Sequence, residues 1–413
     1  MRKLLPIIIG ALLLSACHDK KDDGIIKRTV LVYMAADNNL TQNSSRIDFA
    51  QEDIVQMMEG SKQLADNCKL LLFVDKRNNT TSKQKPYFML VENGDTIRLE
   101  TFDSEINSGD PATLRMAIQW AIDNYKAESY GLVLWGHADG WIIRNQAPAF
   151  SRSTRAYGAD NTVGTKWMDI PEMAQTLGTF PKFSFVFADC CAFQCVESAY
   201  ELRECTDYII ASAAEIPGEG APYQTIVPAL FSQSPTFYKT VADAYFAQNS
   251  YGYIEPIAVV KTSELENLAQ ATHAVLGTFL PQMEDGGRRP NVDGLIYYFD
   301  HTQFDMNDFI LRYASENEYA QWKRVFDRAV VYSKMAPVWM SNKHVYYKSP
   351  NNEQEFRDFT VTEDRYGGLG MYVPQDKANI SGYTNITFSI NKLNDNIRLM
   401  QWYQAAGLAE FGW

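Results

Sequence analysis

A chain of 413 residues, of which 46% are hydrophobic and 13% aromatic, can bury a large core and is long enough for two structural units. Its formal net charge of −12 argues against nucleic acid as a partner, because phosphate backbones attract basic surfaces. The same acidic balance favours basic substrates.

Residues 1–16 predict a signal peptide, because a basic start precedes an apolar run, Leu4 to Leu14, that is too short to span a bilayer. The following Ser15-Ala16-Cys17 resembles the end of a bacterial lipobox, which implies cleavage before Cys17 and lipidation of its sulfur. Residues 17–26 then form the lipidated cysteine and a hydrophilic tether. We expect an outer membrane lipoprotein that faces the periplasm or the cell surface. An ordinary secretory signal with a chance cysteine is the alternative.

From residue 27 onward, apolar runs alternate with helical patterns, which predicts an α/β architecture. Short apolar runs bounded by turn residues predict strands at 30–34, 70–74, 131–135, 183–188 and 208–212, with a hairpin over 87–100. One-sided apolar spacing predicts helices at 46–59, after Asp110-Pro111, at 168–178 and at 194–204. The polar stretch 141–166 is predicted to be an exposed loop.

The pattern is less regular in residues 251–413, which we predict to be an α+β extension packed on a core at 27–250. Helices are expected at 262–280 and 304–334, and strands near 343–348, 368–373 and 386–390.

Two predicted strands end at reactive side chains, His137 and the run Asp189-Cys190-Cys191. A single crossover helix between them predicts parallel neighbours, so that His137 and Cys191 meet at one edge of the sheet. A thiol beside an imidazole is the minimum machinery of a cysteine hydrolase. The backbone amides near Gly136, Ala138 and Cys191 would hold an oxyanion, and a helix start after Cys191 would favour its thiolate. A satisfied core histidine and an inert core cysteine are the alternatives.

Strand alternation predicts that Cys190 points away from Cys191, whereas Asp189 shares the face of Cys191. A carboxylate at that position suits a cationic side chain beside the scissile bond, although capping of the next helix would also explain it. The mature chain holds an odd number of other cysteines, so that at least one thiol stays unpaired within it. Their spacing does not suit zinc, and we predict no metal or cofactor, leaving a need for calcium open.

The sequence resembles the clostripain family from about residue 27 to 375. The resemblance rests on motifs that occur in the family's order: 30–40, the strand 132–137 with Gly140-Trp141, Asp189-Cys190-Cys191 with Val196-Glu197, Ala211-Ser212 with Pro217-Gly218-Glu219-Gly220 and Tyr223, and 370–374. It implies a caspase-like three-layer sandwich with a mostly parallel central sheet, and a Cys/His dyad that cleaves after Arg or Lys. It selects Cys191 as nucleophile and His137 as its partner, and it places Asp189 in the S1 pocket with Glu219 nearby.

Two positions depart from the family. Ala138 stands where the family has glycine, and Ala221-Pro222 replaces the usual tryptophan. Family members can cut themselves in the loop after the histidine, which makes Arg152 the candidate site here, with Arg144 and Arg155 behind it.

The sequence thus predicts a lipid-anchored, monomeric cysteine endopeptidase whose partners are Arg- or Lys-containing peptides and, through its anchor, a membrane. A catalytically silent, caspase-like surface lipoprotein that binds protein or glycan is the main alternative. A serine or metal hydrolase lacks its motifs, since neither G-x-S-x-G nor H-E-x-x-H occurs. A redox protein would need Cys190, Cys195 and Cys205 as much as Cys191.

Overall fold

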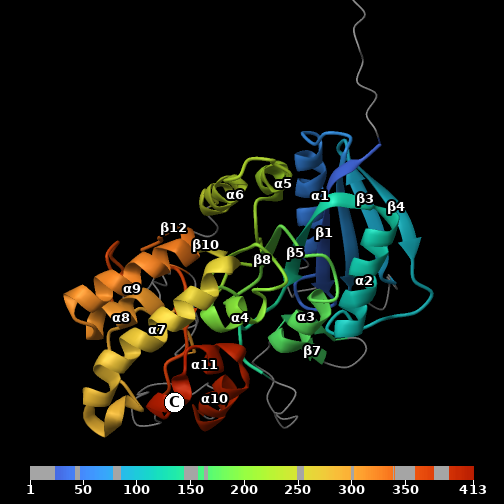
Figure 1. Cartoon of the computed structure of the whole chain (residues 1–413). Helices are drawn as coiled ribbons and strands as arrows, with labels where there is room; N and C mark the ends of the chain where they lie inside the picture. Colours follow the sequence, from blue (N-terminus) through green and yellow to red (C-terminus); the bar gives the residue numbers. More distant parts are fainter. Residues whose placement is uncertain are drawn as a thin grey trace, which may run out of the picture.

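The central sheet has nine strands, five of which are parallel and lie in the middle (Figure 1). The computed structural model describes residues 24–41, 47–77, 85–143, 157–161, 166–248, 255–298, 302–337, 339, 359–375 and 390–413. The strand order is β12-β10-β9-β8-β5-β1-β2-β3-β4, with antiparallel pairs at both edges. The strands are β1 (Ile26–Ala36), β2 (Cys68–Lys76), β3 (Tyr87–Glu92), β4 (Asp95–Thr101), β5 (Ala127–Gly136), β8 (Phe185–Asp189), β9 (Tyr208–Ala211), β10 (Ile257–Lys261) and β12 (Val330–Lys334).

Helices cover both faces of this sheet, which accounts for the continuous apolar runs in its strands. Leu31 and Tyr33 of β1 pack into one apolar cluster, and Val30 and Val32 pack into the other. The second cluster is closed by α1 (Phe49–Ser61), α5 (Tyr223–Leu230) and α6 (Phe237–Phe246). The first is closed by α2 (Pro111–Asn124), α3 (Ile170–Leu177), α4 (Val196–Glu201), α7 (Leu265–Phe279), α8 (Met306–Tyr313) and α9 (Glu316–Ala329). The predicted three-layer α/β fold is confirmed.

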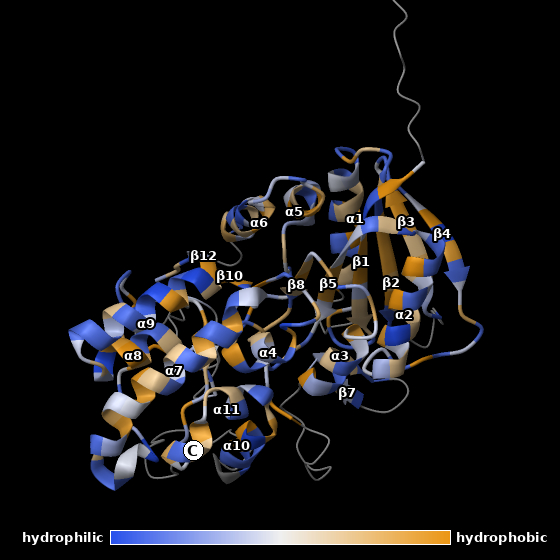
Figure 2. Ribbon diagram, in the orientation of Figure 1, coloured by the Kyte–Doolittle hydropathy of each residue, from blue (hydrophilic) through white to orange (hydrophobic). Residues whose placement is uncertain are grey.

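The hydropathy of the chain follows these layers. In Figure 2 the central strands are mostly hydrophobic, whereas the helices mix hydrophobic and hydrophilic residues. Within the part of the chain that the structure describes, no helix combines the length and the apolar character needed to cross a membrane.

The sheet continues across the boundary predicted at residue 250, because β10 pairs with β9 and β12 pairs with β10. The helix predicted at 262–280 is present as a 3-10 turn, Thr262–Glu264, followed by α7. The last elements are β11 (Phe304–Asp305), β13 (Gly370–Met371), α10 (Ile390–Asn396) and α11 (Gln401–Ala405).

The single helix predicted at 304–334 is wrong in three places. Residues 304–305 form the strand β11. Ser315 starts a new helix, α9, through a capping box with Glu318. Residues 330–334 form β12, in keeping with the strand preference of their β-branched and aromatic side chains. The strand predicted at 368–373 shortens to β13, and Ile390 begins a helix instead of ending a strand. The strand predicted at 343–348 and residues 386–389 lie outside the described residues.

The exposed loop predicted at 141–166 is also wrong at its described ends. Trp141 and Tyr157 are fully buried, and Tyr157 begins β6 (Tyr157–Asp160), which pairs with β7 (Lys166–Met168). The Tyr157 hydroxyl donates to the carbonyl of Tyr33 at 3.0 Å and to that of Trp135 at 3.1 Å. Both ends of this stretch are therefore fixed to the core. Arg144, Arg152 and Arg155 lie outside the described residues.

Candidate active site

His137 and Cys191 lie at the same edge of the sheet. β5 and β8 are parallel neighbours, and Trp135 is level with Asp189 in their register. His137 follows Trp135 by two residues and Cys191 follows Asp189 by two, so that both emerge at the carboxyl ends of adjacent strands. Both side chains line one pocket of about 290 Å³. The structure therefore brings together the two residues on which the sequence argument depended.

Five segments build the walls of this pocket. They are the chain after β1, the start of α1, the ends of β5 and β8, and the turn after β9. The lining residues are Asn39, Leu40, Phe49, Trp135, Gly136, His137, Asp189, Cys191, Glu215, Ile216, Pro217, Gly218 and Gly220.

The Cys191 thiol is half-buried and hydrogen-bonded to the backbone. Its Sγ lies 3.4 Å from the amide nitrogen of Ile216, which donates to it, and 3.7 Å from the carbonyl oxygen of the same residue. Burial raises the pKa of Cys191 well above its usual range, and the negative charges of Glu215, Asp139 and Asp189 raise it further. The resting sulfur is therefore a thiol, which needs a base before it can act as a nucleophile.

This finding corrects the expectation that a helix start would favour the Cys191 thiolate. α4 begins at Val196, five residues further on, and it has only six residues. The largest effect on the pKa of this sulfur is burial, and the carboxylates of Glu215, Asp139 and Asp189 add to it.

His137 contacts a residue that the sequence argument did not single out, Asn39. The Nε2 atom of His137 is 2.9 Å from Oδ1 of Asn39, which follows the carboxyl end of β1. With an amide oxygen as acceptor, Nε2 carries the proton and Nδ1 is the nitrogen of the neutral ring that can take one. The sheet topology is the signal that could have predicted this contact, because β1 and β5 are parallel neighbours that end together.

Cys190 points away from the pocket, as strand alternation predicted. It is 1% exposed and packs in the apolar cluster on the opposite face of the sheet from Cys191. Cys195 and Cys205 are also buried, and Cys68 is half-buried. All the cysteines of the described residues are free thiols, and Cys17 lies outside them.

Asp189, which we call the floor carboxylate, is 3% exposed and is one of the residues that line the pocket. Its Oδ2 accepts hydrogen bonds from the Tyr223 hydroxyl at 2.8 Å and the Ala221 amide at 3.2 Å, while its buried Oδ1 has no hydrogen-bond donor. Burial raises the pKa of Asp189 to about 6, against the lowering effect of these two bonds. Cys195 occupies the N-cap of α4, so Asp189 does not cap that helix.

Glu219 lies beside the pocket without being one of its lining residues. It is half-buried between Gly218 and Gly220, which do line the pocket. Burial raises the pKa of Asp53 and of Glu255, and the charge of Glu219 raises each of them further. Glu219 therefore adds negative charge around the pocket without lining it.

The backbone immediately before His137 requires glycine. Gly136 has a φ of +147°, and a Cβ atom there would lie 2.9 Å from the carbonyl oxygen of Ala35. Gly136 lines the pocket, whereas Ala138 is buried and forms a β-bridge with Tyr157. The predicted role of both amides at an oxyanion stays a prediction.

Comparisons with known proteins agree with this arrangement. The model of the clostripain family matches residues 32–408. Clostripain of Hathewaya histolytica is 24% identical over 225 residues, and the match spans 48% of this chain and 41% of the length of that relative.

Two solved structures share the fold over nearly the whole chain. A secreted C11 cysteine protease from Bacteroides thetaiotaomicron, solved with an irreversible peptide inhibitor, has a TM-score of 0.71 and 27% identity, covering 93% of this chain and 99% of its own. An inactive zymogen C11 protease from Parabacteroides distasonis has a TM-score of 0.69 and 28% identity, covering 92% and 97%.

Proposed function

Because the chain belongs to the clostripain family of cysteine peptidases, we propose that it is an endopeptidase that cleaves after Arg or Lys through Cys191 and His137. The observation that carries this proposal is one pocket that holds a thiol, an imidazole and a carboxylate oxygen without a donor. The thiol and the imidazole supply covalent catalysis, and the carboxylate supplies recognition of a cation.

In the first step, Nδ1 of His137 takes the proton from Sγ of Cys191, and the sulfur attacks the carbonyl carbon of the scissile bond. The raised pKa of Cys191 supports general-base activation during this step over a thiolate that exists beforehand. Asn39 keeps the proton on Nε2, so that Nδ1 is available as the base. Backbone amides near Gly136, Ala138 and Cys191 stabilise the oxyanion in this proposal.

In the second step, the protonated His137 gives its proton to the leaving amine, and the C–N bond breaks to leave an acyl group on Cys191. Water, activated by the same imidazole, then hydrolyses the thioester and restores the thiol. The energy for selecting the substrate comes from Asp189, whose Oδ1 can accept a hydrogen bond from a guanidinium or ammonium group. Glu219 adds long-range attraction for the same cation.

The test is an assay of fluorogenic peptides that carry Arg, Lys, Asp or Leu at P1, using the chain without residues 1–23. We expect cleavage after Arg or Lys in the wild type and none in Cys191→Ala. Activity that survives this substitution would move the nucleophile elsewhere. A folded protein that cleaves none of the peptides would favour the binding-scaffold alternative.

The proposal also includes lipid anchoring at Cys17, an outer membrane location and self-cleavage after Arg152, which rest on the sequence alone. Mass spectrometry of the protein recovered from a Gram-negative host would test the first and the third. An unmodified residue 17 would exclude the anchor. An intact 144–156 segment in an active enzyme would exclude self-processing in that segment.

A further inference from the structure

The inner face of α1 carries a carboxylate in a row of apolar side chains. Ala50, Ile54 and Met57 of this helix pack into the second apolar cluster. Asp53, on the same side of the helix, is buried with 1% of its surface exposed. Burying a carboxyl group costs free energy that an apolar residue of similar size would not cost. A specific contact of Asp53 is therefore expected to account for its place in the helix.

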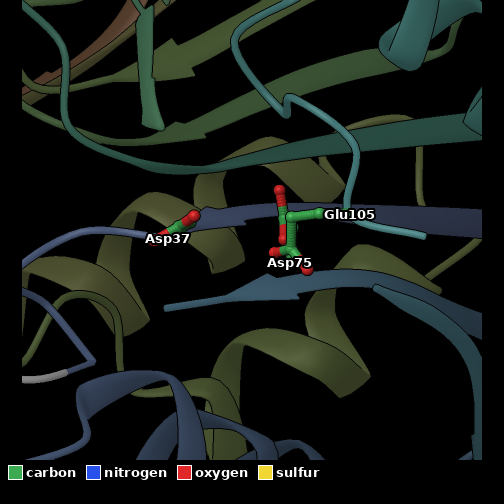
Figure 3. Close-up of side chains that lie close together, drawn as sticks. All are labelled: Asp37, Asp75 and Glu105. Carbon is green, nitrogen blue, oxygen red and sulfur yellow. The ribbon is translucent and has the colours of Figure 1, made fainter. Parts of the chain in front are cut away.

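Asp53 is separate from a group of acidic side chains beyond the strands of the sheet. Asp37, Asp75 and Glu105 lie close together (Figure 3), and none of them lines the pocket of Cys191 and His137. Strand alternation places Asp75 on the side of the sheet that faces the first apolar cluster, away from α1. Burial raises the pKa of Asp53 well above its usual range, and the charge of Asp189 raises it further. Asp53 therefore belongs to the surroundings of the pocket.

Asp53 holds the indole of Trp135, which is one of the residues that line the pocket. The Nε1–H group of Trp135 donates to Oδ2 of Asp53 at 2.7 Å, and both side chains are buried. Trp135 is level with Asp189 in the register of β5 and β8, so strand alternation places their side chains on the same face of the sheet. A buried indole N–H that loses its acceptor pays the full cost of desolvation, so this hydrogen bond fixes the orientation of the ring.

The start of α1 supplies a second apolar wall. Phe49 lines the pocket, and Asp53 follows it by four residues, so that the two share one face of the helix. The Phe49 ring lies against Gly218, because a Cβ atom on Gly218 would be only 2.6 Å from Cε2 of Phe49. The helix therefore reaches the pocket twice, through the Phe49 ring and through the indole that Asp53 holds.

We propose that Asp53 is a positioning residue for the P1 side chain, because it fixes Trp135 as an apolar wall of the S1 pocket. Arg and Lys carry a stem of methylene groups, which packs on apolar surface while the charged head meets a polar partner. Trp135 and Phe49 supply apolar surface in the pocket where Asp189 accepts that head. The inference rests on the proposed function, and it adds a residue that touches neither the substrate nor the nucleophile.

The experiment compares the steady-state kinetics of variants of the full chain on peptides with Arg at P1. Asp53→Leu removes the acceptor and should raise KM about tenfold with kcat nearly unchanged, because the wall acts on the ground state and the transition state alike. Asp53→Asn keeps an oxygen that can accept from the indole and should keep the wild-type KM. A purely structural role would not give this split, since a loss of folded enzyme lowers the apparent kcat and leaves KM unchanged.

A pair of tryptophan variants gives the matched control. Trp135→Phe keeps a ring but removes the N–H donor, and it should raise KM as Asp53→Leu does. Trp322 is also buried and donates its indole N–H, to the Thr272 hydroxyl at 3.1 Å, but it does not line the pocket. Trp322→Phe should therefore keep the wild-type KM.

An unchanged KM in folded Asp53→Leu would overturn the inference. A KM that rises as much in Asp53→Asn as in Asp53→Leu would also overturn it, because the effect would then come from the charge and not from the hydrogen bond. If Asp53→Leu does not fold, Trp135→Phe against Trp322→Phe decides, and equal KM values in the two would refute the role of the wall. A wild type that cleaves neither Arg nor Lys peptides would refute the proposed function and this inference with it.

Discussion

Replacing the floor carboxylate by an amide, Asp189→Asn, should remove most of the preference for a cationic P1 side chain. In the proposed function, the buried Oδ1 atom of Asp189, which has no donor, is the acceptor for that cation. A hydrogen bond to a charged group contributes about 1.5–3 kcal/mol, which corresponds to a roughly 10- to 150-fold loss in kcat/KM for Arg peptides. Peptides with an uncharged P1 residue should lose far less.

The pKa of about 6 for Asp189 adds a pH dependence to this prediction. Cleavage after Arg should fall as the pH drops through about 6, because protonation of Asp189 removes the charge that attracts the substrate. The ratio of kcat/KM for Arg peptides to that for Leu peptides, measured across this range, isolates the effect, because ionisations that act on both substrates alike cancel in the ratio. Asp189→Asn should show a flat ratio.

The same shift predicts the effect of Asp189→Asn on stability. A folded-state pKa raised from 3.8 to about 6 means that the ionised carboxylate destabilises the free enzyme by at most about 3 kcal/mol above pH 6, and not at all below pH 3.8. The variant should therefore unfold in urea at pH 7.5 no more easily than the wild type. A folded Asp189→Asn variant that keeps the wild-type ratio of Arg to Leu cleavage would refute the reasoning.

Three further substitutions test other contacts. Asn39→Ala should lower kcat about tenfold with little change in KM, because His137 loses the acceptor that fixes its tautomer. Steady-state kinetics would measure both constants, and an unchanged kcat would argue against this role of Asn39. Gly220→Ala should raise KM for Arg peptides, since φ there is +56° and a Cβ would lie 2.8 Å from Oδ2 of the floor carboxylate. Arg365→Ala should lower the free energy of unfolding, measured in urea, by about 3 kcal/mol. The substitution removes the guanidinium that donates to both carboxylate oxygens of Asp308, whose side chain is only 4% exposed.

The sheet and the position of the dyad could be predicted from the sequence because the signals are local. Each buried parallel strand is an apolar run, and each ends at the edge where the site lies. One crossover helix between the strands that lead to His137 and Cys191 was enough to place the two residues side by side.

The errors arose where distant segments meet. Burial of Trp141 and Tyr157 depends on partners across the fold, so the polar composition of 141–166 concealed it. The pKa of Cys191 is set by burial and by Glu215 and Asp139, which no local helix argument includes. The contact between Asn39 and His137 likewise depends on the pairing of β1 with β5.

The central claim is that Cys191 is the nucleophile of a pocket that selects a cation. Intact-mass measurement after exposure to an electrophilic peptide probe with Lys at P1 tests it most directly. We expect one adduct, located on Cys191, in the wild type and in Cys190→Ala, and no adduct in Cys191→Ala or with a probe that carries Asp at P1. An adduct that persists in Cys191→Ala, or equal labelling by the Lys and Asp probes, would contradict the account.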